Sequence, residues 1–151
     1  MTDAPVLFSE LPTRSGARIG VATLNAEKSL NSLTLEMIDL LAAQTRAWAE
    51  DLGIAFILLE GAGDRAFCAG ADLSSGGKTF NSGERDPEEA VGGELVLPWQ
   101  IRKPVVAAIN GHAVGVGITY PLCADLRFVA EDAKCQFAFV RRGMKIGRAH
   151  V

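Results

Sequence analysis

The sequence predicts an α/β fold in which short buried strands alternate with helices. Apolar runs of strand length stand at 54–59, 105–109 and 126–130, and residues 35–50 repeat apolar side chains with helical spacing. The run IAFILL at 54–59 is apolar without interruption, whereas a strand with one solvent-exposed face would alternate apolar and polar residues. We therefore expect a central strand covered on both faces. Strands that alternate with helices favour βαβ units with right-handed crossovers in a mostly parallel sheet.

The N-terminal part predicts a hairpin followed by the long helix. Residues 6–11 and 18–24 have the pattern of strands, and residues 14–16 (RSG) supply the connection between them. Thr34 is placed to cap the helix at 35–50. One face of that helix is expected to be buried, namely Leu35, Ile38, Leu41, Ala42, Thr45 and Trp48.

Glycine, proline and polar residues mark the later elements. The polar stretch at 74–93 predicts a surface loop or a lid, and 94–102 predicts a short helix that Pro98 starts or bends. A small apolar stretch at 116–124 predicts a buried helix, and CQFAFV at 135–140 predicts the last strand.

Length, charge and cysteine content restrict the class of protein. The chain has 151 residues, 48% hydrophobic and 22% charged, which suits one globular domain. A net charge of −3 offers no basic face for nucleic acid or an anionic membrane, and no apolar run approaches the roughly 20 residues of a membrane span. Cys68, Cys123 and Cys135 are far apart, so we expect buried free thiols rather than a disulfide scaffold or a zinc site. No secretory signal is visible, so a cytoplasmic location is expected, with an organelle as the alternative.

The last residues depart from the pattern of the rest. CQFAFVRRGM at 135–144 is well patterned, but KIGRAHV at 145–151 has no cap, strand or tail chemistry and looks like a translated sequencing adapter. We therefore expect one incomplete domain at 1–144 followed by a non-native tail, with a frayed natural terminus as the alternative. An incomplete sheet would leave apolar surface exposed.

Two glycine bends are the first candidates for a functional site. Residues 69–71 (AGA) and 115–117 (GVG) each follow a candidate strand of one sheet. If those strands are neighbours, the amides of Ala71 and Val116 can point at one oxygen atom. Each such donor contributes about 2.7–4 kcal/mol to a transition state that carries an oxyanion. Both bends can also be tight turns only, and spacing alone leaves the two interpretations open.

Three separated motifs carry a family resemblance. They are LNAEKSLNSLTLEMIDLL at 24–41, FCAGADL at 67–73 and KPVVAAINGHAVGVGITYPLCADLRFVAEDAK at 103–134. Together they closely resemble the crotonase superfamily, which includes enoyl-CoA hydratases and isomerases, over residues 6–144. The resemblance implies the N-terminal part of a ClpP/crotonase spiral of ββα units, assembled as a homotrimer or a dimer of trimers.

The resemblance also implies a substrate and a set of site residues. The substrate is an acyl-CoA thioester whose enolate is stabilised between the amides of Ala71 and Val116. Coenzyme A is then part of the substrate, and neither a further cofactor nor a metal is implied. Substrate contacts are implied at Ser29, Ala69, Gly70, Asp72, Leu73, Ser74, Gly115, Gly117 and Thr119.

Two positions depart from the hydratase pattern. Thr119 and Phe139 stand where the resemblance places the two glutamates of hydratases. Paired carboxylates activate water and deliver a proton to the α-carbon, whereas neither Thr nor Phe titrates near neutral pH. The hydratase mechanism, and an isomerase mechanism that uses the second glutamate, therefore do not carry over. Some relatives have an acid just after the RRGM-like stretch, but this chain leaves the pattern at Lys145, so we expect it to be inactive by itself.

Two other functions stay open. A 3-hydroxyacyl-CoA hydrolase of the same fold is one, because LNSLTLEMI at 30–38 is also typical of that branch. A non-catalytic acyl-CoA binding or assembly protein is the other, motivated by Thr119 and Phe139.

Several remaining residues have both a chemical and a structural interpretation. The chemical interpretations are a base at Asp72 and at Asp125, a ligand contact at His112, and a contact to CoA phosphates at Arg141-Arg142. We expect the structural role for each: turn caps or ion pairs at Asp72 and Asp125, an exposed turn residue at His112, a solvated pair at Arg141-Arg142, and packing at Trp48 and Trp99.

Overall fold

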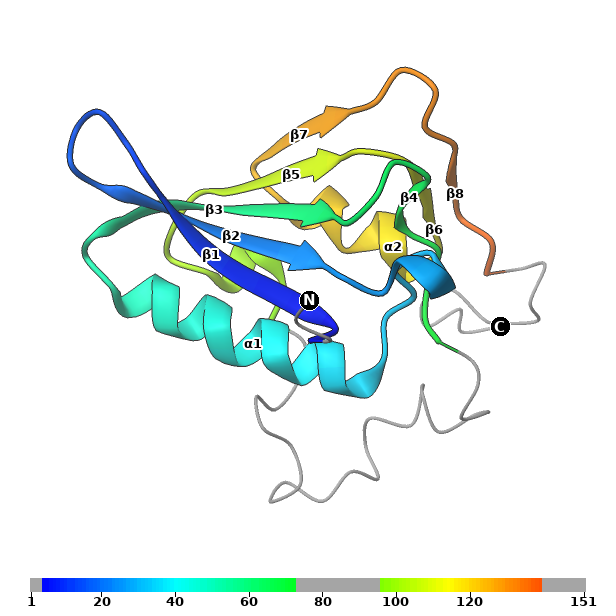
Figure 1. Ribbon diagram of the computed structural model, residues 1–151, viewed down its shortest axis with the longest axis horizontal. Coiled ribbons are helices and arrows are strands. Elements are labelled where there is room, and N and C mark those ends of the chain that lie inside the picture. Colours follow the sequence, from blue (N-terminus) through cyan, green and yellow to red (C-terminus); the bar gives the residue numbers. More distant parts are fainter. Residues whose placement is uncertain (1–3, 73–95, 140–151) are drawn as a thin grey trace, which may run out of the picture.

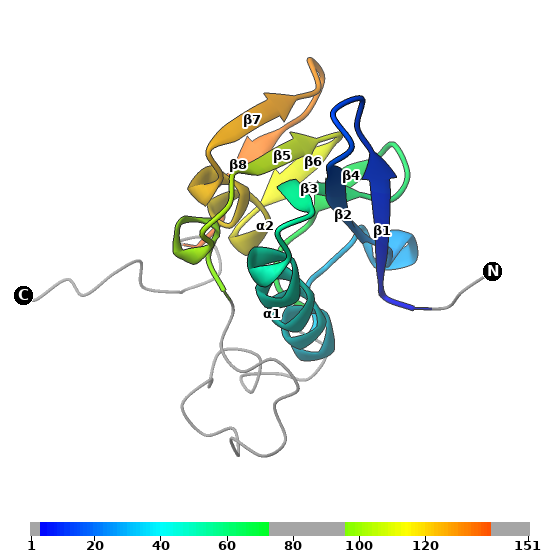
Figure 2. The same ribbon diagram turned by 90° about the vertical axis from the view of Figure 1, so that its left-hand side faces the viewer.

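Two β-sheets form the frame of the molecule. A computed structural model describes residues 4–72 and 96–139, which Figures 1 and 2 show from two sides. The larger sheet has the order β1-β2-β3-β5-β7 and the smaller has the order β4-β6-β8. β1 and β2 pair antiparallel, and the other pairs are parallel. The strands are β1 (Val6–Pro12), β2 (Arg18–Leu24), β3 (Ile54–Gly61), β4 (Ala66–Cys68), β5 (Val105–Ile109), β6 (His112–Val114), β7 (Leu126–Val129) and β8 (Cys135–Gln136).

The hairpin and the long helix match the prediction. β1 and β2 are joined by a turn in which the Thr13 amide donates to the Ala17 carbonyl at 2.8 Å. α1 (Leu35–Glu50) covers the predicted range and lies against the larger sheet in both views (Figures 1 and 2). It connects β2 to the parallel strand β3, which is the predicted βαβ unit. The core between helix and sheet includes Ala22, Leu24, Met37, Leu41, Ile57 and Leu59.

The buried face of α1 is rotated from the predicted one. Leu35 and Ile38 are only half-buried, so their predicted place in the core is wrong. One buried stripe of the helix follows a spacing of four, four and three, from Met37 to Trp48. Leu35 and Ile38 lie beside that stripe. The buried residues are Met37, Asp39, Leu41, Ala42, Thr45 and Trp48.

Thr34 caps α1 as predicted, and its removal should be measurable. Its Oγ1 accepts a hydrogen bond from the amide of Met37 at 3.2 Å, which satisfies one of the unpaired amides of the first turn. Thr34→Ala is expected to lower the free energy of unfolding by about 1 kcal/mol in urea denaturation. Thr34→Ser keeps the acceptor and should stay close to the wild type. Equal losses in both variants would contradict the capping role.

β3 is central in the larger sheet but is covered more completely on one face. Ile54, Ile57 and Leu59 are fully buried, whereas Phe56 and Leu58 on the other face are half-buried. The predicted cover on both faces is therefore only partly right, because α1 lies on one face. At the sheet edge β7 exposes large apolar side chains: Leu126 (58%), Phe128 (65%) and Val129 (52%).

The smaller sheet is the main departure from prediction. The strand directly before the second glycine bend is β6 and not the run at 105–109, which forms β5 of the larger sheet. The chain leaves the larger sheet at Asn110, whose Nδ2 donates to the Gly61 carbonyl at 2.9 Å. A Cβ on Gly111 would lie 2.7 Å from the amide nitrogen of Ala66, so glycine lets the turn after β5 touch the turn after β3.

The helix predicted at 116–124 is divided into two short pieces. α2 spans Val116–Thr119, and a 3₁₀ turn follows at Pro121–Cys123. Proline has no N–H to continue the helical ladder, so Pro121 begins a new turn instead of extending α2.

The remaining segments are shorter than predicted or lie outside the described residues. Within the described residues the last strand, predicted at 135–140, covers only Cys135–Gln136, and a 3₁₀ turn at Pro98–Gln100 begins at Pro98. No helix within the described ranges has the length and apolar character needed to cross a membrane. Outside the described residues lie the predicted loop or lid at 74–93, the domain end at 144, the tail at 145–151 and the pair Arg141-Arg142.

Single residues were predicted with mixed success. Trp48 is buried, but Trp99 is 67% exposed, because the 3₁₀ turn buries Pro98 in its place. Asp125 has a structural role, but between neighbouring strands rather than as a turn cap: its Oδ2 accepts from the first amide of β5 at 2.7 Å, and its own amide donates to the Val105 carbonyl at 2.9 Å. His112 is exposed as expected but belongs to strand β6 rather than to a turn.

Candidate active site

The two glycine bends follow neighbouring strands. We call residues 69–71 the first elbow and residues 115–117 the second elbow; they follow β4 and β6. β4 and β6 pair in parallel, with Cys68 opposite Ala113. Because parallel strands run in the same direction, both elbows emerge at the same edge of the smaller sheet. The strands that lead to the two bends are therefore neighbours, which is the condition stated above for the amides of Ala71 and Val116 to point at one oxygen atom.

Close approach of the two main chains explains the glycines. Gly70 has a φ of 117° and Gly115 has a φ of 58°, which favour glycine. A Cβ on Gly70 would lie 3.2 Å from the carbonyl oxygen of Val114. A Cβ on Gly117 would lie 2.8 Å from the carbonyl carbon of Cys68, and closer still to its oxygen. Each elbow therefore closely approaches the last residue of the strand that leads into the other elbow.

The amides of Ala71 and Val116 stand outside the hydrogen-bond ladders. A parallel bridge joins Leu33 to Ala71, and its bonds, both 2.8 Å, use the Gly70 carbonyl and the Asp72 amide. Val116 is the first residue of α2, where amides have no intrahelical acceptor. Neither amide donates to another residue within the described ranges. Adjacent elbows thus each carry at least one main-chain donor without a partner in the described part of the chain.

The loop before α1 runs beside the first elbow. The amide of Ala69 donates to the Leu30 carbonyl at 2.9 Å, next to Ser29. Ser29 itself is exposed, and its Oγ donates to a carbonyl of the same loop at 3.0 Å. The structure therefore brings Ser29 and Ala69 to neighbouring positions, whereas Leu73 and Ser74 lie outside the described residues.

Thr119 and Phe139, where the resemblance implies the glutamates of hydratases, flank the second elbow. The amide of Thr119 donates to the Gly115 carbonyl at 3.1 Å, and its Oγ1 donates to the Val116 carbonyl at 3.4 Å. Phe139 reaches the same elbow, since its ring Cε1 is 3.9 Å from where a Cβ on Gly115 would lie. Both side chains are half-buried. A hydroxyl and a phenyl ring provide no general acid or base near neutral pH.

Two contributors to the elbows were missed from the sequence. Val114 lies in the three-residue strand β6, whose sequence HAV is too short to give a strand signal. Asn31 is fully buried in the loop beside the first elbow. The sequence shows only the polar pair Asn31-Ser32 between two leucines in LNSL, and this pair indicates a structural role only when the partners of Asn31 are known.

Cys68 lies at the base of the first elbow and is the only buried cysteine in the described ranges. Its Sγ donates to the Gly70 carbonyl at 3.6 Å, and burial raises its pKa to about 11. Cys123 is half-buried and Cys135 is exposed, so the expectation of three buried thiols is wrong for both. The cause is position, since Cys135 lies on the short strand β8 at the edge of the smaller sheet.

The raised pKa predicts unequal thiol labelling. At pH 8 a thiol with a pKa near 11 is only about 0.1% thiolate, and the thiolate is the reactive form. An alkylating reagent is therefore expected to modify Cys135 and to leave Cys68 unmodified in the folded protein. Peptide mass spectrometry with and without urea measures both sites. Equal labelling rates of Cys68 and Cys135 in the folded protein would contradict the prediction.

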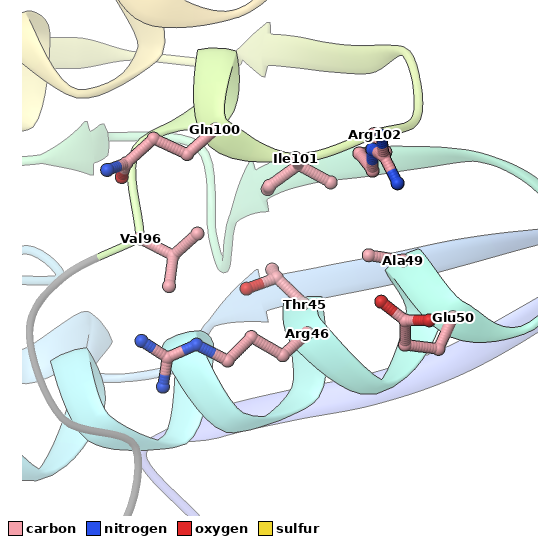
Figure 3. A pocket seen from close by; sticks show the side chains of 8 residues that line it. All are labelled: Thr45, Arg46, Ala49, Glu50, Val96, Gln100, Ile101 and Arg102. Carbon is pink, nitrogen blue, oxygen red and sulfur yellow. The ribbon is translucent and has the colours of Figure 1, made fainter.

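A pocket of about 370 Å³ lies elsewhere, between α1 and residues 96–102 (Figure 3). Arg46 and Glu50 of α1 lie opposite Gln100 and Arg102, and none of the residues that line it belongs to an elbow. Within residues 4–72 and 96–139, no three His, Cys, Asp or Glu side chains gather as a metal site would require. The elbows are therefore the stronger candidate for chemistry.

Comparison with known proteins identifies the family. The family model for enoyl-CoA hydratase/isomerase matches residues 19–141. The chain belongs to the enoyl-CoA hydratase/isomerase family. An enoyl-CoA hydratase of Alternaria alternata is 43% identical over 131 residues, covering 83% of this chain and 42% of that protein. A mitochondrial 3-hydroxyisobutyryl-CoA hydrolase of Danio rerio is 33% identical over 139 residues, covering 90% of this chain and 36% of that protein.

Solved structures of this family confirm the predicted crotonase-type fold. An enoyl-CoA hydratase of Mycobacterium marinum superposes with a TM-score of 0.73 at 30% identity, covering 95% of this chain and 52% of that chain. An enoyl-CoA hydratase/carnithine racemase of Magnetospirillum magneticum reaches a TM-score of 0.78 at 24% identity, which supports the fold alone. The chain spans about half the length of these structures and less than half the length of the two relatives above.

Proposed function

We propose that the chain binds an acyl-CoA thioester and holds its carbonyl oxygen between the amides of Ala71 and Val116. The supporting observation is that each elbow closely approaches the strand leading into the other, so that two donors without partners in the described ranges lie at one edge of the smaller sheet. Membership of the enoyl-CoA hydratase/isomerase family supports the ligand class. Removal of an α-proton moves negative charge onto the thioester oxygen. Two fixed amides stabilise that enolate more than they stabilise the neutral carbonyl.

The proton transfers need groups that the second elbow does not supply. Thr119 and Phe139 occupy the two positions where the resemblance implies glutamates, and neither accepts a proton near neutral pH. We propose that this chain binds the thioester without hydrating it, and that an acid or base beyond residue 144 completes the site in an active protein.

Ligand titration tests the binding proposal. Crotonyl-CoA is expected to bind about tenfold more tightly than the matched S-(but-2-enyl)-CoA thioether, which has a methylene group in place of the carbonyl, because two additional hydrogen bonds form. Calorimetry with both ligands measures the ratio, and CoA alone serves as the control for the shared part. Equal affinity for thioester and thioether would overturn the proposed hole. Hydration of crotonyl-CoA, followed as loss of enoyl absorbance, would overturn the proposed inactivity.

A thioester hydrolase is the second candidate function. It is favoured by the identity of 33% to the Danio rerio protein named 3-hydroxyisobutyryl-CoA hydrolase, and by a similar match of 35% to its Xenopus tropicalis counterpart. The same two amides would then stabilise the tetrahedral oxyanion formed when water attacks the thioester carbon. Release of free CoA from 3-hydroxyisobutyryl-CoA, detected with a thiol reagent, would select the hydrolase. Unchanged thioester selects the non-catalytic binding function proposed above.

Assembly and location complete the proposal. We propose a homotrimer or a dimer of trimers located in the cytoplasm. Exposed apolar side chains, among them Phe128 (65%) and Phe137 (56%), support association with other chains. Sedimentation equilibrium of the purified chain measures the state, and a monomer at micromolar concentration would contradict assembly.

A further inference from the structure

Asn31 is a buried polar residue whose hydrogen bonds connect three segments. It is 0% exposed, and its Nδ2 donates to the carbonyls of Ala62 at 3.0 Å and Ala66 at 2.9 Å. Its Oδ1 accepts from the amide of Ala26 at 2.9 Å. The side chain therefore joins the loop before α1 to both ends of the turn between β3 and β4. A φ of 56° holds its backbone in the left-handed region that asparagine tolerates better than most residues.

The loop that contains Asn31 is bonded directly to the first elbow. On one side of Asn31, the Leu30 carbonyl accepts from the Ala69 amide at 2.9 Å. On the other side, Leu33 exchanges two bonds of 2.8 Å with Gly70 and Asp72. Both bonded residues lie within two positions of Asn31. Any movement of Asn31 is therefore passed to the main chain that carries the amide of Ala71.

The turn to which Asn31 is bonded is held from its other side as well. Asn110 Nδ2 donates to the carbonyls of Gly61 at 2.9 Å and Gly63 at 2.7 Å, and its Oδ1 accepts from the Gly61 amide at 3.0 Å. Asn110 lies just before β6, which leads to the second elbow. The turn is thus a common reference to which both elbows are tied, one through Asn31 and the other through Asn110.

We propose that Asn31 is a positioning residue that sets the direction of the Ala71 amide relative to the second elbow. It acts through the loop at Leu30 and Leu33 and does not itself contact the thioester oxygen. The inference rests on the proposed function, because it assigns a role in the same two-amide hole. Loss of the carboxamide frees the loop from the β3–β4 turn, so the first donor loses its alignment while the second keeps its own.

A 3-ketoacyl-CoA is the probe, because its enolate absorbs in the near ultraviolet and its keto form does not. At saturating acetoacetyl-CoA and fixed pH, the wild type is expected to raise the bound enolate fraction above that of the free ligand. Asn31→Gly keeps the left-handed backbone and removes the carboxamide, and we expect at least a tenfold lower enolate-to-keto ratio. Affinity for CoA alone should change less than twofold. Asn31→Asp, which keeps the acceptor and loses both donated bonds, is the second variant if the glycine variant does not fold.

Two control variants separate positioning from general destabilisation. Asn25→Gly removes another carboxamide whose Nδ2 donates to a carbonyl, that of Ala4 at 2.9 Å, at a site without a bond to either elbow. Leu41→Ala destabilises the core beneath α1 without touching the elbows. Both should keep the wild-type enolate ratio once the folded fraction is taken into account from urea unfolding.

The outcomes distinguish this inference from the proposed function. A wild type that does not enrich the enolate overturns the two-amide hole, and the role of Asn31 with it. An enriched wild type with Asn31 variants within twofold of it overturns the inference alone. An equal loss in Leu41→Ala at matched stability also overturns it, since the effect would then follow stability rather than alignment. Loss confined to the Asn31 variants supports the proposal.

Discussion

Replacing Gly117 with alanine is expected to weaken crotonyl-CoA binding by about tenfold and to lower the free energy of unfolding by about 3 kcal/mol. A Cβ at this position would lie 2.8 Å from both the carbonyl carbon and the Cβ of Cys68, and closer still to the carbonyl oxygen. These atoms belong to the base of the first elbow and cannot rotate away, so α2 has to move. The amide of Val116 moves with α2, and the two proposed donors no longer meet at one oxygen.

Urea unfolding and crotonyl-CoA titration of the same variant measure both effects. Gly16→Ala is the matched control, because nothing lies within 4 Å of the added methyl, at the tip of the hairpin. Its φ of 88° is unfavourable for alanine and should cost about 1 kcal/mol in stability, without a change in affinity. Affinity of Gly117→Ala within twofold of the wild type would show that the contact between α2 and β4 is not needed for binding.

Replacing Trp48 with alanine is expected to destabilise the fold by about 3–5 kcal/mol, a large part of the stability of a small domain. Trp48 is 2% exposed, and its ring lies flat against Gly20, where a Cβ would be only 2.6 Å from the ring. It also packs edge-on against Phe8, with ring centroids 5.8 Å apart, and its Nε1 donates to Glu10 at 3.0 Å. Alanine removes all three contacts and leaves a cavity between α1 and the hairpin.

Trp99→Ala provides the comparison, since Trp99 is 67% exposed and its loss should change stability by less than about 0.5 kcal/mol. Denaturation followed by far-ultraviolet circular dichroism avoids the loss of the fluorophore in either variant. Similar midpoints for the two variants would contradict the packing role of Trp48.

Local patterns were sufficient for the larger sheet and for α1. The spacing of apolar residues at 35–50, the cap at Thr34 and the runs that became β3 and β5 are properties of neighbouring residues along the chain. Such signals predict element type well, because side-chain periodicity follows directly from helix and strand geometry. The same signals predict less well which face of a helix is buried. The buried stripe of α1 includes Met37 and leaves out Leu35 and Ile38, which were predicted for it.

The candidate site depended on contacts that are distant in sequence. The two glycine bends and their donors, Ala71 and Val116, could be named from the sequence. The strand that leads to the second bend could not be named, because β6 has three residues and exists only through pairing with β4 and β8. A strand of this length has no periodicity of its own, and its stability comes from ladder bonds with its neighbours.

By itself the sequence determined the α/β class, the N-terminal hairpin, the long helix and the family of the chain. Each of these is encoded in residues that are close together or in motifs with their own composition. Only the tertiary structure decided that Gly70 lies against Val114 and that Gly117 lies against Cys68. It also decided that Asn31 and Asn110 hold one turn from two sides. All of these contacts involve main-chain atoms of residues that are distant in the sequence. Main-chain atoms are the same in every residue, so no side-chain pattern predicts the contacts.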